Sequence, residues 1–463
     1  MRTSKPKIAL KIIAVLIAAA LVNTGLVLAL EPYGSKSQVI WSDYVATVER
    51  GESLDTVLIG TSLIEQGVDI AAFDAALGSS SYNMGSPSQT IEESLLALKT
   101  ACEDFDIKRV ILGVSISEMN RSKPSNPASP FIRERSRAVG WAETAATIAG
   151  QLFRPEVLAS KESLNCLFPW VENHVDPNVS SIKQNLQMRF TDMPVAEAAH
   201  IQDPSWTYVG RGFAVCDMLY NPDTDPGFEF TKEFIESDDG IPDENRVNTL
   251  REICAYCADN GIELIAVSVP IPVNSIEYYG DGYFRQHDAI EDLLSEYQVP
   301  FYDFNLAKPE LFDPEPDYFA DRSHLNGKGA AAFGTTLGTF LANPTDPDDE
   351  NAFYTESEYW DSLEGISTLL VDAQTAEGGT LAKCLGLTGP KDADRIEYRM
   401  LLRDEDGAWQ CVRDWDTEGD YLYERTEHGT FEIRVEARLA SEDGTSTAAE
   451  DEFERYRELT LYY

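Results

Sequence analysis

Three patterns of apolar and polar residues divide this chain of 463 residues. The first is an apolar run from Ile12 to Leu30, in which Asn23 and Thr24 are the ordinary polar residues. A helix of this length, rising about 1.5 Å per residue, is close to the thickness of a hydrocarbon core. The run therefore predicts a membrane-spanning helix within residues 1–31.

The charges that flank this helix predict its orientation. Four basic residues precede it, namely Arg2, Lys5, Lys7 and Lys11, whereas Glu31 and an acidic chain follow it. By the positive-inside rule, the N-terminus of this single-pass protein lies in the cytosol and the rest of the chain is extracytoplasmic. A cleaved signal peptide begins in a similar way, although its apolar core is usually shorter. Under both interpretations, the rest of the chain is exported.

The second pattern is an alternation of short apolar strands with amphipathic helices. It predicts strands at 55–60, 108–113, 262–269 and 299–303, and helices at 42–49, 90–105, 245–260, 283–297 and 327–341. Such an alternation is typical of a parallel sheet with helices on both faces. Because residues 50–343 carry the pattern, we predict an α/β domain over 32–343.

A segment inside this domain departs from the alternation. Residues from about 121 to 242 are rich in aromatic side chains, among them Trp141, Trp170 and Trp206. This composition is too aromatic for a disordered linker. We interpret the segment as an insertion that covers one side of the sheet, either as a substrate lid or as a packing extension.

The third pattern lies at the C-terminal end. An acidic linker at 344–355 precedes two segments, 396–400 and 431–439, in which apolar and charged residues alternate. Half-buried antiparallel strands show this alternation because successive side chains point to opposite faces. We therefore predict a small β-sandwich over 356–463.

The amino-acid composition limits the classes of partner that the chain can bind. The chain has 37 Lys and Arg against 79 Asp and Glu, a net charge of −42, which repels phosphate backbones and argues against a nucleic-acid partner. Seven cysteines are an odd number for an exported protein and fix no disulfide connectivity. Cys254 and Cys257 form a CxxC without a second pair at zinc spacing, so we predict that they pack in a helix and that no metal is bound.

Two segments carry residues with catalytic chemistry. Ser62 follows the strand at 55–60, where the carboxyl end of a parallel strand presents side chains to a crevice. Far downstream, Asp321 precedes His324 by three residues just before a helix, so one short loop can present both side chains. His324 can then accept the proton of Ser62 while Asp321 orients the imidazole. By itself, each segment is more often a turn or a cap.

Together these segments resemble blocks one, two and five of the SGNH (GDSL-like) hydrolase superfamily. The matching residues are Gly60-Thr61-Ser62, Tyr82-Asn83-Met84-Gly85 and the run from Asp321 to Gly329. More narrowly, they resemble the membrane-anchored branch with DltD-like and alginate O-acetylation-like proteins. The resemblance implies a flavodoxin-like sheet, Ser62 as nucleophile, His324 as base and Asp321 as its partner. It also implies an oxyanion hole that includes the backbone N–H groups of Ser62 and Gly85.

The sequence departs from the family pattern at two places. Thr61 stands where GDSL enzymes have Asp, a position outside the triad. In the third block, Gly113-Val114-Ser115 replaces the GxND motif, so the asparagine that completes the oxyanion hole is missing. Ser115 or Asn83 is the remaining side chain for that task, since losing one donor weakens binding of the transition state.

These observations predict an extracytoplasmic, membrane-anchored serine esterase or acyltransferase acting on O-acyl groups, in particular O-acetyl groups, of a cell-envelope or exported polysaccharide. Hydrolysis and transfer share an acyl-enzyme and differ in whether water or a sugar hydroxyl attacks it. The family resemblance implies a membrane-embedded acyl donor of the MBOAT type as a partner, and the mechanism needs no cofactor. The alternative is a catalytically degenerate envelope module that binds glycan or a partner acyltransferase.

Overall fold

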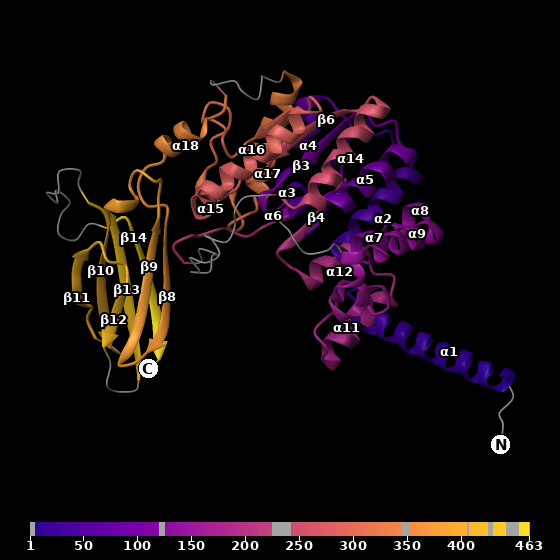
Figure 1. The fold of residues 1–463 in the computed structure, drawn as a ribbon, viewed down its shortest axis with the longest axis horizontal. Coiled ribbons are helices and arrows are strands. Elements are labelled where there is room, and N and C mark those ends of the chain that lie inside the picture. The colour runs from indigo at the N-terminus through magenta and orange to yellow at the C-terminus, as the bar shows by residue number, and fades with distance from the viewer. Residues whose placement is uncertain are drawn as a thin grey trace. The chain divides into compact units, whose positions relative to one another are not determined.

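The computed structural model describes residues 5–119, 126–224, 242–343, 352–404, 407–424, 429–440 and 453–462 (Figure 1). Contacts divide the chain into two compact units. The first comprises Met1–Asp217 and Asp243–Ile265, and the second comprises Met218–Pro242 and Ala266–Tyr463.

The first unit begins with the apolar helix and continues as alternating helices and strands. Its elements before the insertion are α1 (Lys5–Leu30), α2 (Lys36–Glu49), β1 (Thr56–Ile59), α3 (Ser62–Gly67), α4 (Ile70–Leu77), β2 (Ser81–Asn83), α5 (Ile91–Asp104), β3 (Arg109–Gly113) and α6 (Ile116–Met119). After the insertion come α14 (Glu244–Asn260) and β6 (Glu263–Ser268), which runs on into the second unit.

Five strands form one parallel sheet in the order β2-β1-β3-β6-β7, with β7 at Phe301–Asp303. This is the flavodoxin-like order, because the first strand lies between the second and the third. Every residue of β1 is buried, as expected for a strand covered on both faces, and this explains its continuous apolar sequence. The predicted α/β class is confirmed, as are the predicted strands to within a few residues.

Side-chain caps explain where the helices begin and end. Thr90 and Glu93 form a capping box at the start of α5, and Asp243 caps α14. Gly261 ends α14 in the left-handed conformation, with a φ of 66°. The helix predicted at 42–49 begins earlier, at Lys36, because the Ser35 side chain accepts a hydrogen bond from the N–H of Gln38.

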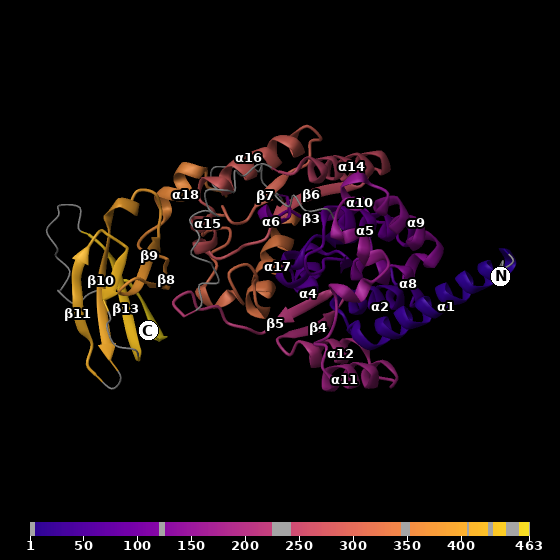
Figure 2. The ribbon, with the colours of Figure 1, turned by 60° about the horizontal axis from the view of Figure 1, so that its bottom comes forward.

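The insertion consists mainly of short helices followed by a hairpin. Its elements are α7 (Pro130–Glu134), α8 (Ser136–Val139), α9 (Trp141–Leu152), α10 (Pro155–Leu158), the 3₁₀ helices η1 (Lys161–Cys166) and η2 (Pro169–Val171), α11 (Val179–Arg189), α12 (Val195–Gln202), β4 (Trp206–Gly210) and β5 (Phe213–Cys216). The hairpin β4–β5 lies beside α12 (Figure 2), where Trp206 and Ala199 pack against Val39 of α2.

The second unit holds the last strand of the parallel sheet and a β-sandwich. Its helices are α15 (Val273–Tyr279), α16 (Asp281–Ser295), η3 (Pro316–Tyr318), α17 (Gly327–Ala342), α18 (Glu356–Ser362) and η4 (Ala393–Arg395). Its further strands are β8 (Thr368–Ala376), β9 (Gly379–Leu387), β10 (Ile396–Asp404), β11 (Gln410–Asp416), β12 (Tyr421–Glu424), β13 (Thr430–Leu439) and β14 (Arg455–Tyr462).

Two antiparallel sheets, β11-β10-β13-β14 and β12-β9-β8, make up this sandwich. Leu369 and Tyr423 from one sheet and Met400 and Ile433 from the other share one buried core. The predicted small β-sandwich is therefore confirmed. Most of the predicted acidic linker, residues 344–351, lies outside the described residues.

Candidate active site

Ser62 is the first residue of α3, directly after the strand β1 and the turn Gly60-Thr61. Thr61 caps the helix, since its Oγ1 accepts a hydrogen bond from the N–H of Leu63 at 3.3 Å. A side chain at Gly60 would come within 2.9 Å of Ile64 and 3.1 Å of the carbonyl oxygen of Gly113. The tight turn thus requires glycine and leaves Ser62 half-buried at the carboxyl end of the strand.

Asn83 joins α3, the helix that begins with Ser62, to the end of β2 through hydrogen bonds. Its side chain is fully buried, its Nδ2 donates to the carbonyl oxygen of Ile64 at 2.7 Å, and its Oδ1 accepts from the N–H of Gly85 at 2.9 Å. Both bonds occupy groups that the sequence suggested as oxyanion donors. In this structure Asn83 positions the helix, and a donor role for Asn83 or Gly85 stays a prediction: Asn83 has a second N–H on Nδ2, whereas the N–H of Gly85 would have to leave Asn83 Oδ1.

The insertion reaches this site through the turn of its hairpin. The carbonyl oxygen of Arg211 accepts from the N–H of Asn83 at 2.9 Å. Gly212 follows with a φ of 80°, and a Cβ there would lie 1.6 Å from the carbonyl oxygen of Asn83. The turn of the hairpin is therefore in close backbone contact with Asn83 at the end of β2.

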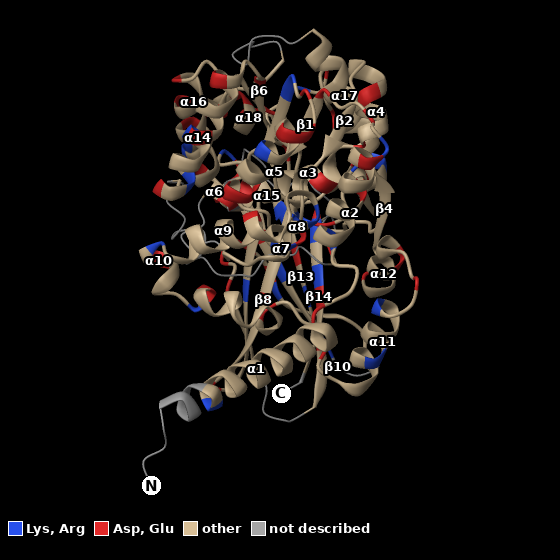
Figure 3. Cartoon of the chain, turned by 90° about the vertical axis from the view of Figure 1, so that its right-hand side faces the viewer, with Lys and Arg blue, Asp and Glu red and all other residues tan. Residues whose placement is uncertain are grey.

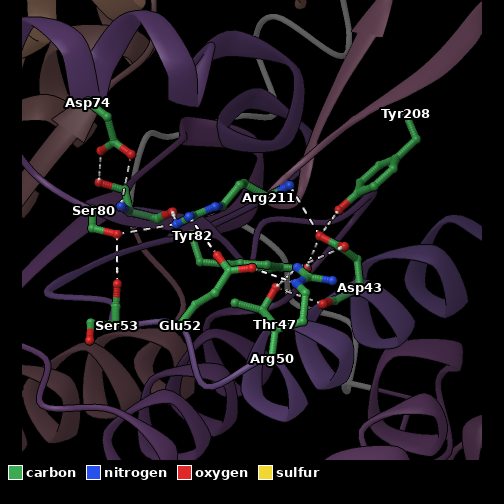
Figure 4. Close-up of polar contacts among 11 residues, drawn as sticks. Asp43, Thr47, Arg50, Glu52, Ser53, Asp74, Ser80, Tyr82, Tyr208 and Arg211 are labelled. Atoms are coloured by element: carbon green, nitrogen blue, oxygen red, sulfur yellow. Dashed lines mark hydrogen bonds and ion pairs between the residues drawn. The ribbon is translucent and has the colours of Figure 1, made fainter.

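A polar network holds the hairpin in this place (Figure 4). The guanidinium of Arg211 donates to Glu52 at 2.7 Å, and its backbone N–H donates to Asp43 at 3.2 Å. The hydroxyl of Tyr208 donates to the same Asp43 carboxylate at 2.7 Å. Burial raises the pKa of Tyr208, and the nearby Asp43 charge raises it further, so the hydroxyl stays a donor.

Asp321 and His324 are brought together by the loop between η3 and α17. His324 Nδ1 lies 2.9 Å from Asp321 Oδ2, while Asp321 Oδ1 accepts from the N–H groups of Ser323 at 2.7 Å and His324 at 3.0 Å. The sequence predicted this pairing from the three-residue spacing. Burial raises the pKa of Asp321, but the hydrogen bonds and the charge of His324 outweigh it and hold that pKa below its ordinary value. Asp321 is thus a carboxylate that fixes the imidazole with Nδ1–H as donor.

The helix that follows keeps this loop closed. Asn326 caps α17, because its Oδ1 accepts from the N–H groups of Lys328 and Gly329. Its Nδ2 donates back to the carbonyl oxygen of Asp317 at 2.7 Å. A Cβ on Gly329 would lie 2.3 Å from the carbonyl oxygen of Tyr318, so glycine is needed for this close approach. The run of residues around His324 is therefore specified by local backbone geometry.

Glu65, which the sequence did not single out, is buried one turn after Ser62. The indole N–H of Trp206 donates to Glu65 Oε1 at 3.2 Å, and Oε2 has no hydrogen-bond partner. Burial raises the pKa of Glu65 to about 8, against the opposing charge of Lys36. A single glutamate on a short polar stretch gives no sequence signal of burial, because the residue that covers it comes from the distant insertion.

One cluster has the residue types of a metal site. On α16, His287, Asp288 and Glu291 bring one ligand atom each within 4.8 Å of one another. His287 Nδ1 also lies 3.0 Å from Asp303 Oδ2. Burial lowers the pKa of His287, but the hydrogen bond and charge of Asp303 outweigh it and raise that pKa above its ordinary value. His287 Nδ1 is therefore engaged by Asp303, and a cation at this nitrogen would have to displace that contact.

The CxxC pair is packed inside its helix. Cys254 and Cys257 lie on the buried face of α14 and are 2% and 1% exposed. Burial raises the pKa of these thiols to about 11 and about 12, so neither is a thiolate at neutral pH. The predicted packing role is confirmed.

Ser115, the remaining sequence candidate, follows β3 and is half-buried. Its backbone carbonyl accepts from the N–H of Met119 at 3.1 Å and so starts α6. Ser62, Asn83, Gly85 and Ser115 therefore belong to the first unit, whereas Asp321 and His324 belong to the second.

Comparisons with known proteins complete these observations. No family model matches the sequence, and no curated protein matches it. Among solved structures, 16 chains match. One is a GDSL-like lipase from Bacteroides thetaiotaomicron, 10% identical, covering 66% of this chain and 100% of its own length at a TM-score of 0.30. Another is a lipase/acylhydrolase from Enterococcus faecalis, 11% identical, covering 64% and 100% at a TM-score of 0.27.

Proposed function

We propose that this protein is a membrane-anchored serine esterase or O-acyltransferase that acts on O-acyl groups of a cell-envelope or exported polysaccharide. The observation that carries the proposal is the Asp321–His324 pair. Two backbone N–H groups fix the carboxylate, and the carboxylate fixes the imidazole tautomer. That is the arrangement a histidine needs to act as a general base through Nε2.

In the proposed reaction, Ser62 Oγ attacks the acyl carbon while its proton passes to His324 Nε2. Asp321 stabilises the imidazolium that forms. The tetrahedral intermediate then collapses, the bond to the leaving alcohol breaks, and that alcohol takes the proton from His324. Water or a sugar hydroxyl attacks the acyl-enzyme in the second half, so the same residues serve hydrolysis and transfer. The proposal requires Ser62 Oγ to come within hydrogen-bond distance of His324 Nε2.

The oxyanion that forms on the acyl group needs donors from the first unit. The proposal assigns the backbone N–H of Ser62 as the first donor, with Ser115 as a second. Gly85 becomes a third if its N–H leaves Asn83 Oδ1. Losing one such donor costs about 3 to 4 kcal/mol of transition-state stabilisation in serine hydrolases, so a chain without the usual asparagine is expected to be slow.

The apolar helix supports the membrane part of the proposal. Among the described residues, one helix has a stretch long and apolar enough to cross a membrane, namely Leu10–Leu30 of α1. Figure 3 shows no charged residue in this stretch beyond its beginning. Its end is bound to the folded unit, because the carbonyl oxygen of Leu30 accepts from the N–H of Val175 at 2.8 Å. This bond favours a retained anchor over a cleaved signal peptide.

Labelling with a fluorophosphonate tests the catalytic proposal. The full chain in detergent is compared with Ser62→Ala, His324→Ala and the matched control Ser295→Ala, an exposed serine on α16. We expect labelling of the wild type and the control and loss of labelling in both site variants. Labelling that persists in Ser62→Ala would show that another serine reacts and would refute the assignment.

A non-catalytic, glycan-binding or partner-binding module is the second candidate function. The observation that favours it is that the N–H of Gly85 donates to Asn83 Oδ1, so this N–H is already engaged within the protein. Absence of labelling in a wild type that unfolds cooperatively would support this candidate, and direct glycan binding would then be measured.

A further inference from the structure

Part of the insertion exposes large apolar side chains beside the end of α1. They lie on η1, η2 and α11 and on the residues that flank them, and we call them the apolar collar: Leu164, Leu167, Phe168, Val171, Val179 and Phe190. Leu167 is 62% exposed, Val179 is 84% exposed and Phe190 is 71% exposed. Large apolar side chains left exposed on elements that contact α1 mark an interaction site.

The collar is attached to α1 inside its apolar run. Asn23 Nδ2 donates to the carbonyl oxygen of Leu167 at 2.8 Å, and the indole N–H of Trp170 donates to Asn23 Oδ1 at 2.9 Å. Asn23 precedes Leu30 by seven residues, so at 1.5 Å per residue these bonds lie about 10 Å before the end of the helix. An asparagine in an apolar helix needs such partners, because an unpaired amide in hydrocarbon is costly.

The helix α11 also holds the end of the apolar run. Asn185 is fully buried, and its Nδ2 donates to the carbonyl oxygens of Ala29 and Glu31 while its Oδ1 accepts from the N–H of Tyr33. Arg189 adds a further hydrogen bond to the carbonyl oxygen of Glu31. The insertion is therefore joined to α1 by polar contacts over the last turns of the helix.

Beside this polar contact, α11 presents an apolar stripe to the outside. Val179, Ile182, Leu186 and Phe190 recur at spacings of three and four residues, which places them on one helical face. They line a groove of about 650 Å³. Nothing among the described residues fills it.

We propose that the apolar collar lies in the lipid bilayer that surrounds α1, at the outer leaflet. This inference rests on the proposed membrane anchor. The 21 residues of Leu10–Leu30 span about 30 Å, roughly the whole hydrocarbon thickness. Because the collar is bonded to the last 10 Å or so of that length, a bilayer that covers the helix also meets the collar.

Charge identifies the kind of lipid. The chain carries a net charge of −42, Lys161 beside the collar is paired with Glu172 at 3.1 Å, and Lys183 is the one basic residue that lines the groove. The collar therefore contacts lipid through apolar insertion, and zwitterionic lipid suffices. Since Ser62 belongs to the same compact unit as α1, this contact holds the serine at a fixed tilt to the membrane and favours acyl donors or polymers at the membrane surface.

Photo-crosslinking to lipid tests the inference. The full chain is placed in phosphatidylcholine nanodiscs with p-benzoylphenylalanine at Phe190, at Leu167 or, as a control, at Tyr456, an exposed aromatic residue of β14. We expect a mass shift of one lipid at Phe190 and Leu167 and none at Tyr456. Two exposed positions are used so that one poorly folded variant does not decide the result.

Three outcomes overturn the inference: no lipid adduct at either collar position, a crosslink from both to a second copy of this chain, or a crosslink from both to another membrane protein in native membranes. Extraction of native membranes with alkaline carbonate separates this failure from that of the anchor. A chain that carbonate releases refutes the anchor itself, whereas a chain that is retained but forms no lipid adduct refutes only the role of the collar.

Discussion

Replacing Glu65 by glutamine should change how the stability of the protein depends on pH. In the folded protein the carboxyl is buried beside Trp206, and its pKa is raised by burial to about 8 from an ordinary value of 4.5. Between these two values the folded protein keeps the proton that the unfolded chain releases. Rising pH therefore destabilises the wild type across this window.

The magnitude follows from the same two values. Each pH unit within the window costs about 1.4 kcal/mol, and between pH 5 and pH 8 the ionisation of Glu65 removes about 3.5 kcal/mol of stability. Glutamine keeps an oxygen that accepts the Trp206 indole N–H and has no charge to lose. The Glu65→Gln variant is expected to be close to the wild type at pH 5 and clearly more stable at pH 8.

Urea denaturation of the full chain in mild detergent, followed by tryptophan fluorescence at pH 5, 6, 7 and 8, measures this effect. The difference between variant and wild type cancels the titration of all other groups. Glu49→Gln, at an exposed position on α2, serves as the control and should follow the wild type at each pH. A constant difference between Glu65→Gln and wild type from pH 5 to pH 8 would contradict the burial of an uncharged Glu65.

Three further predictions concern the residues around the site. Asn83→Ala removes the side-chain partner of the carbonyl oxygen of Ile64 and of the N–H of Gly85, so the free energy of unfolding measured in urea should fall by about 2 to 4 kcal/mol. An unchanged urea midpoint would argue against the role of Asn83 in holding α3 to the end of β2. Gly212→Ala should be far more destabilising than Gly140→Ala, because both glycines have a φ of 80° but only at Gly212 does the added Cβ meet backbone atoms. Equal melting temperatures of the two variants would contradict this close approach. Asp321→Asn should slow fluorophosphonate labelling by roughly 10²- to 10⁴-fold in a chain that still unfolds cooperatively, whereas labelling at the wild-type rate would remove Asp321 from the mechanism.

The sequence predicts the parallel sheet well because its strands are buried on both faces. The strand at 108–113 is found as β3 at Arg109–Gly113, and the helix at 327–341 is found as α17 at Gly327–Ala342. The strand β2 was not predicted as a strand, since its three residues Ser81–Asn83 are too few to show a periodicity. Its pairing with β1 depends on a neighbour that only the fold supplies.

The candidate site, too, could be predicted only in part from the sequence. The Asp321–His324 contact could be predicted because it is local and needs one loop. The orientation of Asn83 could not, because its partner Ile64 lies in a helix 19 residues earlier and no spacing in the sequence reveals that contact. A sequence motif thus identifies a candidate residue, but the hydrogen bonds in the fold determine whether its side chain donates to a substrate or to the protein backbone.

The insertion shows that one segment can have two physical roles. Trp206 is 1% exposed and donates to Glu65 across 141 positions of sequence, so the hairpin β4–β5 cannot swing away without exposing a large aromatic ring and an unpaired carboxyl. These contacts favour the packing interpretation for this part of the insertion. The segment η1–α11, in contrast, leaves its apolar side chains outside and bonds to α1 instead. In this structure the hairpin stabilises the short helix that Ser62 begins.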